Sequence, residues 1–205
     1  MTRLRAQLTI GGLALWLSAM LPCDAAGQTS TRDGAWFGIG AGAGRADVTC
    51  DACAATDASS KLGGSAYVKA GWTWNPHVLV GGELNVWTRK RDFDGADAWF
   101  TMYNASATLT LYPSATAGYF VKGGGGMAYV DTDVERRDRR VTLDLGSGPG
   151  FVLGAGYDAR VGRVSITPAV NFWFGHIGNV KARGEVIASG WAQHVVDVTI
   201  GVTFP

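Results

Sequence analysis

The chain has 205 residues with 18 basic and 17 acidic side chains, a length that fits a single domain. Charged residues make up 17% and apolar residues 47% of the sequence, and glycine, at 30 residues, is about twice as frequent as usual. This composition excludes a disordered chain, and because the glycines follow no three-residue period it also excludes a collagen-like one. The balanced charge argues against a nucleic-acid-binding protein, which would carry a basic surface.

The N-terminal segment has the pattern of an export signal. A short basic start is followed by an uncharged apolar run from Leu8 to Leu21 and then by small residues. This order is typical of a cleavable secretory signal, and the apolar run is too short to span a bilayer as a helix. We therefore expect residues 1–27 to be a signal peptide and residues 28–205 to form the mature domain. No later stretch is apolar over enough residues to predict an inner-membrane helix.

Two cysteines remain in the mature chain, in the stretch TCDACAATDASSK. The C-x-x-C spacing of Cys50 and Cys53 occurs in metal half-sites, in redox motifs and in small-loop disulfides. A zinc site needs four ligands, and no second cysteine pair completes one. A redox site needs a thioredoxin-like βαβ context, which the sequence lacks. We expect a disulfide between Cys50 and Cys53 in a surface loop, and neither a metal nor a cofactor.

Apolar and polar residues alternate with period two along the mature chain, which is the pattern of a β-strand with one apolar face. In the last such segment, Val196, Val198 and Ile200 alternate with Asp197 and Thr199. The pattern recurs in eight segments, which cover residues 36–44, 65–74, 78–89, 99–111, 119–129, 142–157, 164–174 and 193–204. The sequence therefore predicts eight strands.

The connections between these segments alternate in length. Short turns rich in Pro, Gly, Asn and Asp are expected at 75–77, 113–117 and 158–163. Longer links are expected at about 47–63, 92–97, 131–141 and 176–190. This alternation predicts an all-β fold, an eight-stranded antiparallel up-and-down barrel that leaves no strand edge free. Pro149, in the motif GSGPG, predicts a bulge or kink within its strand.

The kinds of residue on each face indicate which face is inside. The polar faces carry many glycines and other small residues, which fit the narrow lumen of an eight-stranded barrel. On the apolar faces, aromatic residues cluster towards both strand ends, as in the interfacial girdles of transmembrane barrels. We therefore expect the apolar faces to contact lipid. A soluble, lipocalin-like barrel would place them inside.

Four charged side chains lie in mid-strand on the polar faces. They are Lys69, Glu83, Lys122 and Asp197. If Pro76 centres its hairpin, Lys69 lies opposite Glu83. Because buried charges are tolerated when they are paired, we expect these residues to form a charge network that plugs the lumen.

The export signal, the eight alternating segments and the terminal sequence GVTFP resemble the small outer-membrane β-barrels of the OmpA/OmpX type. The segment YPSATAGYFVKGGGGMAY is similar to a strand–turn–strand unit of that family. The resemblance covers the mature chain and implies a place in the cell outer membrane, in contact with its lipid and lipopolysaccharide. It also implies that barrel-assembly machinery recognises the last strand. That strand usually ends in Phe, whereas here Pro205 follows Phe204.

The sequence shows no catalytic motif. Lipid A deacylase barrels resemble this chain in size and use a His-x-Ser pair, but His77, His176 and His194 are followed two positions later by Leu79, Gly178 and Val196. His194 has no carboxylate at close spacing on its own strand face. The glycine run at 123–126 lacks the Lys and Ser/Thr that follow in a phosphate-binding loop.

Basic residues cluster in two segments near the predicted long links. The first contains Arg89, Lys90 and Arg91, and the second contains Arg136, Arg137, Arg139 and Arg140. Just outside the lipid, these side chains would meet lipopolysaccharide phosphates, which Arg binds bidentately. In the alternative interpretation they belong to solvated loops and pair with neighbouring acidic residues.

Taken together, the sequence predicts an outer-membrane barrel with a structural or surface-interaction role and no catalytic activity. The alternatives are a lipid A-modifying barrel enzyme, a narrow channel and a soluble ligand-binding barrel. The sequence identifies no protein partner.

Overall fold

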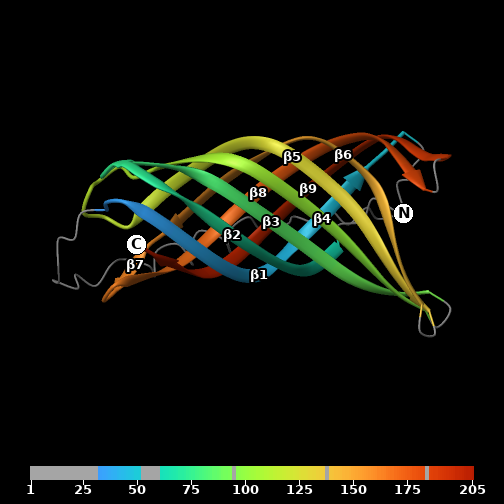
Figure 1. Ribbon diagram of the computed structural model, residues 1–205, viewed down its shortest axis with the longest axis horizontal. Coiled ribbons are helices and arrows are strands. Elements are labelled where there is room, and N and C mark those ends of the chain that lie inside the picture. The colour runs from blue at the N-terminus through green and yellow to red at the C-terminus, as the bar shows by residue number, and fades with distance from the viewer. Residues whose placement is uncertain (1–31, 52–60, 94–95, 137–138, 183–184) are drawn as a thin grey trace, which may run out of the picture. The chain divides into compact units, whose positions relative to one another are not determined.

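The computed structural model describes residues 32–51, 61–93, 96–136, 139–182 and 185–205 (Figure 1). The predicted signal peptide lies outside these ranges. The strands are β1 (Ala35–Thr49), β2 (Lys61–Asn75), β3 (Val78–Phe93), β4 (Ala96–Leu111), β5 (Tyr119–Arg136), β6 (Arg139–Tyr157), β7 (Ala159–Val161), β8 (Val164–Ala182) and β9 (Glu185–Phe204). Among the described residues, no helix has the length and apolar character needed to cross a membrane.

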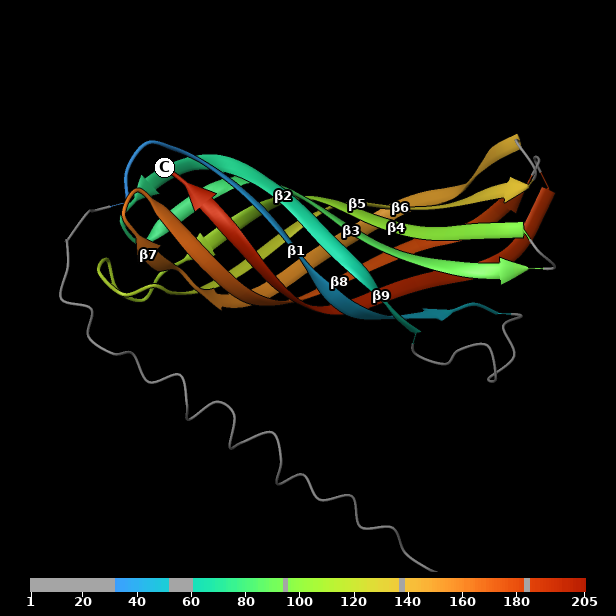
Figure 2. The same cartoon turned by 90° about the horizontal axis from the view of Figure 1, so that it is seen from below.

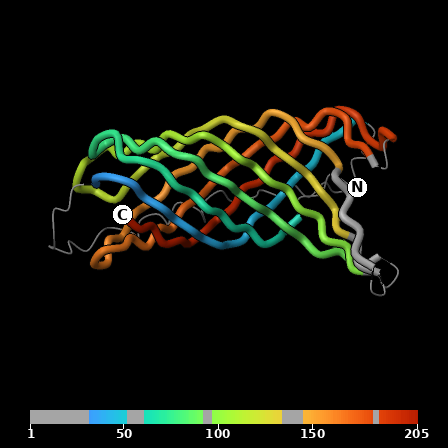
Figure 3. Tube along the Cα trace, viewed as in Figure 1, coloured from blue at the N-terminus to red at the C-terminus, as the bar shows by residue number. Residues whose placement is uncertain are grey.

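The strands form one antiparallel sheet that closes on itself. β1 pairs with both β2 and β9, and β6 pairs with β8, so that all strands except the three-residue β7 form a ring. β7 follows β6 and pairs with β8. The strands cross the barrel obliquely, as closure of a sheet requires (Figures 1 and 3). The predicted eight-stranded antiparallel barrel is confirmed.

Much of what the sequence predicted as long loops is strand. Pairing of β3 with β4 continues to Phe93 and Ala96, and pairing of β5 with β6 continues to Arg136 and Arg139. β8 and β9 are likewise paired up to their connection. Figure 2 shows these strands extending at the end opposite to β7. The prediction was wrong because it ended each strand with its apolar alternation, whereas the backbone ladder continues between polar residues.

The predicted turn at 158–163 is shorter than expected. It contains β7, and Gly162 and Arg163 alone separate β7 from β8. Gly162 has a φ of 63°, a left-handed conformation that glycine adopts without a steric cost.

A bulge in β6 reverses the alternation of that strand. Val130 pairs with Gly146 and Asp131 with Asp144, so that Leu145 is the extra residue. Leu145, expected on the outer face, is consequently buried inside the barrel. The pairing of β6 with β8 begins at Gly150, directly after Pro149, which has no N–H to donate to the ladder.

The apolar faces point outward. On β9, Val198 and Ile200 are 61% and 65% exposed, whereas Asp197 and Thr199 are 3% and 2% exposed. Other large apolar side chains are exposed on the remaining strands of the ring, among them Val68, Trp72, Leu84, Leu109, Val121, Leu153 and Val170. This is the reverse of a soluble barrel, in which water would meet the polar faces.

Aromatic residues form two groups on this outer surface. Near one end, the rings of Phe37 and Phe204 lie 6.3 Å apart, and those of Tyr119 and Tyr157 lie 4.8 Å apart. Nearer the other end, Phe151 contacts Phe172 and Phe174 at 5.8 and 5.4 Å. An apolar band between two aromatic girdles is the outer surface of a transmembrane barrel.

The interior is less polar than predicted. One apolar cluster inside the barrel contains Trp87, Met102, Trp173 and Val195. A second cluster contains Trp36, Leu79, Tyr112, Phe120 and Ala169. The predicted charges occupy a middle layer. The sequence did not indicate the clusters because each of these strands was divided into an apolar lipid face and a polar lumen face.

Candidate functional site

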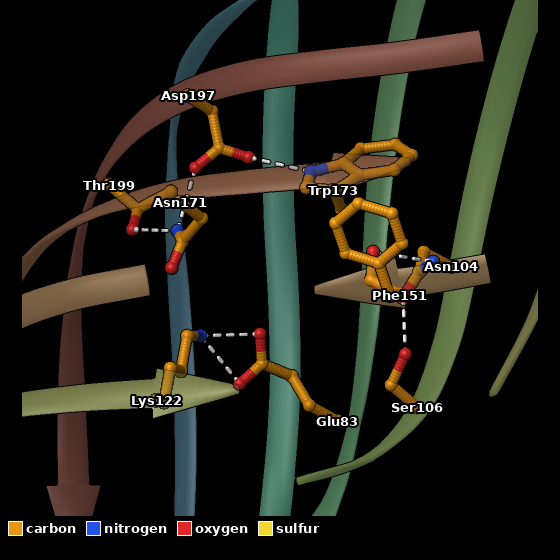
Figure 4. Close-up of polar contacts among 9 residues, drawn as sticks. All are labelled: Glu83, Asn104, Ser106, Lys122, Phe151, Asn171, Trp173, Asp197 and Thr199. Carbon is orange, nitrogen blue, oxygen red and sulfur yellow. Dashed lines mark hydrogen bonds and ion pairs between the residues drawn. The ribbon is translucent and has the colours of Figure 1, made fainter. Parts of the chain in front are cut away.

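Glu83 and Lys122 form an ion pair inside the barrel (Figure 4). The Lys122 ammonium on β5 donates to both carboxylate oxygens of Glu83 on β3, at 2.5 and 2.6 Å. Their side chains are 5% and 1% exposed. A Cβ on Gly154 of β6 would lie 2.7 Å from the Lys122 Cε atom, so the glycine leaves room for the lysine chain.

Lys69 lies opposite Glu83 in the β2–β3 register, as the sequence predicts, but it does not form the ion pair. Its ammonium instead lies 5.6, 5.7 and 5.9 Å from the ring centroids of Tyr67, Phe120 and Trp36. These are cation–π distances. Two lysines therefore flank Glu83, and Lys69 lies among aromatic rings instead of joining the ion pair.

Asp197 is held by hydrogen bonds to neutral groups. It accepts from the Asn171 amide at 2.7 Å and from the Trp173 indole at 3.1 Å (Figure 4). The same Asn171 amide donates to Thr199 at 3.3 Å. Asp197 thus belongs to a polar layer that joins β8 to β9, beside the Glu83–Lys122 pair.

Apolar side chains enclose this polar layer. Trp87 and Trp173 are 2% and 0% exposed. At the end of the barrel that carries β7, Tyr112 donates to Asp158 at 2.5 Å and packs against Phe120. Side chains therefore fill the barrel on both sides of the charges, which is the arrangement of a closed lumen rather than of a pore.

Arg32 covers the end of the barrel near Tyr112. Its guanidinium lies 3.5 Å from the Tyr112 ring and donates to the carbonyl oxygens of Ala115 and Ala117 at 3.1 and 2.8 Å. The sequence analysis missed this residue, because Arg32 precedes the first alternating segment and no pattern marks it.

The predicted basic residues of the outer rim are only partly described. Lys90 lies in β3, where its ammonium is 2.7 Å from Asp97 and 5.9 Å from the Trp99 ring. Arg89 and Arg91 alternate with Lys90 along β3. Arg137 lies outside the described residues, and the side chains of Arg136, Arg139 and Arg140 are not described.

Cys50 is disulfide-bonded. The predicted partner, Cys53, lies outside the described residues, so the Cys50–Cys53 pairing stays a prediction. No three His, Cys, Asp or Glu side chains of the described ranges are grouped so that they would hold a metal ion.

Of the histidines, His194 has an acidic partner that the sequence analysis missed. Its Nε2 atom lies 3.6 Å from an Asp47 carboxylate oxygen, and the two residues are opposite each other on β9 and β1. His77 lies in a turn, 2.9 Å from the Tyr112 carbonyl oxygen. The pair with Asp47 escaped notice because the carboxylate belongs to a strand that is distant in sequence.

No family model and no curated protein sequence matches this chain. Among solved structures, it is similar to Neisserial surface protein A, with 16% identity and a TM-score of 0.54 over 82% of this chain and 96% of that one. It is also similar to Ail, the attachment invasion locus protein of Yersinia pestis, in complex with the heparin analogue sucrose octasulfate. That match has 11% identity and a TM-score of 0.54 over 83% of this chain and 99% of that one. The chain therefore has the fold of small outer-membrane β-barrels.

Proposed function

We propose that this barrel spans the cell outer membrane as a closed, non-catalytic surface protein, and that its strands project beyond the lipid as an interaction surface. The outward apolar band and its two aromatic girdles support the membrane location. The fold that the chain shares with Neisserial surface protein A and with an attachment invasion locus protein agrees with this role. We further propose that assembly machinery recognises β9, which ends at Phe204.

The observation that carries this proposal is the length of the strands. A transmembrane strand needs about 9–11 residues, whereas β5, β6, β8 and β9 have 18, 19, 19 and 20. On β4 the alternating positions beyond Tyr103 are the buried Thr101, the exposed Trp99 and then Asp97, so the regular apolar outer face ends there. A continuous β-wall that rises above the lipid is a rigid surface for contact with other molecules or cells.

The closed lumen argues against the channel alternative. Conduction needs a polar path from end to end, but the charged layer lies between apolar clusters that contain Trp87 and Trp36. In planar bilayers we expect the protein to give no conductance above background. Steady conductance that changes when Glu83 is replaced would contradict the closed-barrel proposal.

A lipid A-modifying enzyme is the second candidate, and the outward His194–Asp47 pair is the observation that favours it. A histidine held by a carboxylate is the core of many hydrolytic sites. Mass spectra of lipid A from cells with and without the gene test this alternative. Unchanged lipid A supports a non-catalytic barrel, and a changed acyl pattern that depends on His194 would contradict it.

The surface role is tested by labelling single cysteines in intact cells with a membrane-impermeant maleimide. Asp133→Cys, on the projecting part of β5, should react in intact cells. Ser114→Cys, in the turn after β4, should react only after the cells are permeabilised. Equal labelling of both positions in intact cells would contradict the proposed orientation.

A further inference from the structure

A hollow lies on the outward face of β1–β4. Its floor contains Ala70, Gly82 and Ala105, and its sides include Phe37, Val68 and Leu84, around a volume of about 470 Å³. Lys69, Glu83 and Ser106, which alternate with these residues along the strands, complete the lining. Ala70 and Gly82 are opposite each other in the β2–β3 register. The hollow therefore exists because adjacent strands carry small residues where the rest of the band carries large ones.

The packing of the barrel does not require glycine in this sector. A Cβ on Gly82 would meet one atom within 4 Å, the Ser106 carbonyl oxygen at 4.0 Å, and a Cβ on Gly64 would meet none. By contrast, a Cβ on the lumen-facing Gly124 or Gly126 would clash with the backbone of β4. Glycine within a strand marks a bulge, a bend or a place where another molecule approaches closely, and the β2–β3 register is regular at Gly82, so the open space above it is available to another molecule.

A cationic group lies beyond the small residues, towards the projecting end of the barrel. The outward positions of β1 run from Ala41 through Ala43 to Arg45, and in register Ala41 faces Ala66 and Ala43 faces Gly64. Arg45 is exposed, and within the described residues its guanidinium has no ion-pair or hydrogen-bond partner. Small outward residues thus occupy β1 and β2 between the hollow and a free cation.

His194 lies next to Arg45 on the neighbouring strand. Arg45 is opposite Val196 in register and Asp47 is opposite His194, so Arg45 and His194 are diagonal neighbours on one face. Long side chains reach across such a diagonal. Asp47, two residues from Arg45 on the same face, contacts the Nε2 atom of His194, which leaves the Nδ1 atom of the ring for an anion on Arg45.

We propose that this sector binds one phosphorylated lipid of the outer leaflet, with its phosphate on Arg45 and His194 and an acyl chain along the hollow of Ala70, Gly82 and Ala105. Arginine binds phosphate bidentately, and an apolar hollow below a cation matches an amphiphilic anion. A second barrel is convex and would touch Phe37 and Leu84 at the sides before it reached the floor. The inference rests on the proposed function, which brings the projecting end of the barrel to the outer leaflet.

The test is binding of lipid A to the purified full-length mature barrel in non-ionic detergent, with dephosphorylated lipid A and inorganic phosphate as parallel probes. Loss of the phosphates, or Arg45→Ala, should weaken lipid A binding about tenfold or more. Arg163→Ala, which removes an exposed cation from the turn between β7 and β8, should leave binding unchanged. Inorganic phosphate that binds as tightly as lipid A, or unchanged binding by Arg45→Ala, would overturn the inference.

The hollow has a matched pair of variants. Gly82→Val places a side chain on the floor, whereas Gly125→Val does so on β5, outside the hollow, at a glycine whose Cβ would also meet a single carbonyl oxygen at 4.0 Å. Gly82→Val should weaken lipid A binding and Gly125→Val should not. If both variants weakened lipid A binding equally, the assignment of the acyl chain to the hollow would be overturned. It would also be overturned if the barrel self-associated and Gly82→Val alone abolished this, because the hollow would then hold a second barrel. A band that migrates faster without boiling on SDS gels shows that a variant is an intact barrel. If the unaltered protein lacked this band, the proposed function, and not only the lipid site, would be contradicted.

Discussion

Replacing Glu83 by glutamine leaves two lysines inside the barrel without the carboxylate that lies near both. Glu83 binds Lys122 directly and is opposite Lys69 in register. Removal of one partner of a buried ion pair costs about 3–5 kcal/mol, because the remaining charge stays desolvated. The side chains of Glu83 and Lys122 are 1% and 5% exposed. The cost of breaking this pair therefore belongs to the buried range and not to the range of about 0–1 kcal/mol that applies to surface pairs.

Lys122→Met should cost less than Glu83→Gln, at about 1–3 kcal/mol. In that variant Glu83 keeps its charge, and we expect Lys69, which is opposite it in register, to become its partner. Glu83→Gln has no such substitute, because Asp197 is already held by Asn171 and Trp173. The double variant should cost less than the sum of the two single variants.

The free energies of unfolding come from urea titrations of the barrel in lipid vesicles, followed by tryptophan fluorescence and by migration on SDS gels. We expect Glu83→Gln to lower the free energy of unfolding more than Lys122→Met does. The loss in the double variant should be clearly smaller than the sum of the two single losses. A cost below about 1 kcal/mol for Glu83→Gln would mean that water screens the pair and that the lumen is not closed. Equal and additive costs would refute the role given to Lys69.

Three further variants test other parts of the structure. Gly40→Ala should destabilise the barrel by about 1–3 kcal/mol, because a Cβ there meets the Tyr67 ring, and Tyr67→Leu should relieve much of this cost in urea titrations. Asp158→Ala should cost about 2–3 kcal/mol in the same assay, because the Tyr112 and Thr167 hydroxyls both donate to that buried carboxylate; an unchanged midpoint would show that water replaces it. Ile200→Arg, in the apolar band of β9, should cost about 2–4 kcal/mol in vesicles, and no cost would mean that this face meets water.

The ring of eight strands and the direction of their faces could be predicted from the sequence. Period-two alternation on β9 assigns Val198 to the outside and Asp197 to the inside without any knowledge of neighbouring strands. The register of the β2–β3 hairpin followed from its turn, which placed Lys69 opposite Glu83. These features depend on residues that are close in sequence.

Features that depend on contacts between distant strands could not be predicted. The partner of Glu83 is Lys122, two strands away in the ring, and the partner of His194 is Asp47, on the strand that closes the barrel. The extensions of the strands escaped notice for another reason. In the extended parts of the strands the outer positions are no longer regularly apolar, while Ile177 and Val180 still pack inside, so pairing continues after the apolar alternation has ended.

The most direct test of the account is whether the apolar face of the barrel lies in a membrane. Cells are fractionated by osmotic shock, and the membrane fraction is run on SDS gels with and without boiling. The account predicts that the protein stays with the outer membrane and that the unboiled band migrates faster than the boiled one. Release into the osmotic-shock fluid, together with a single band that boiling does not shift, would contradict it.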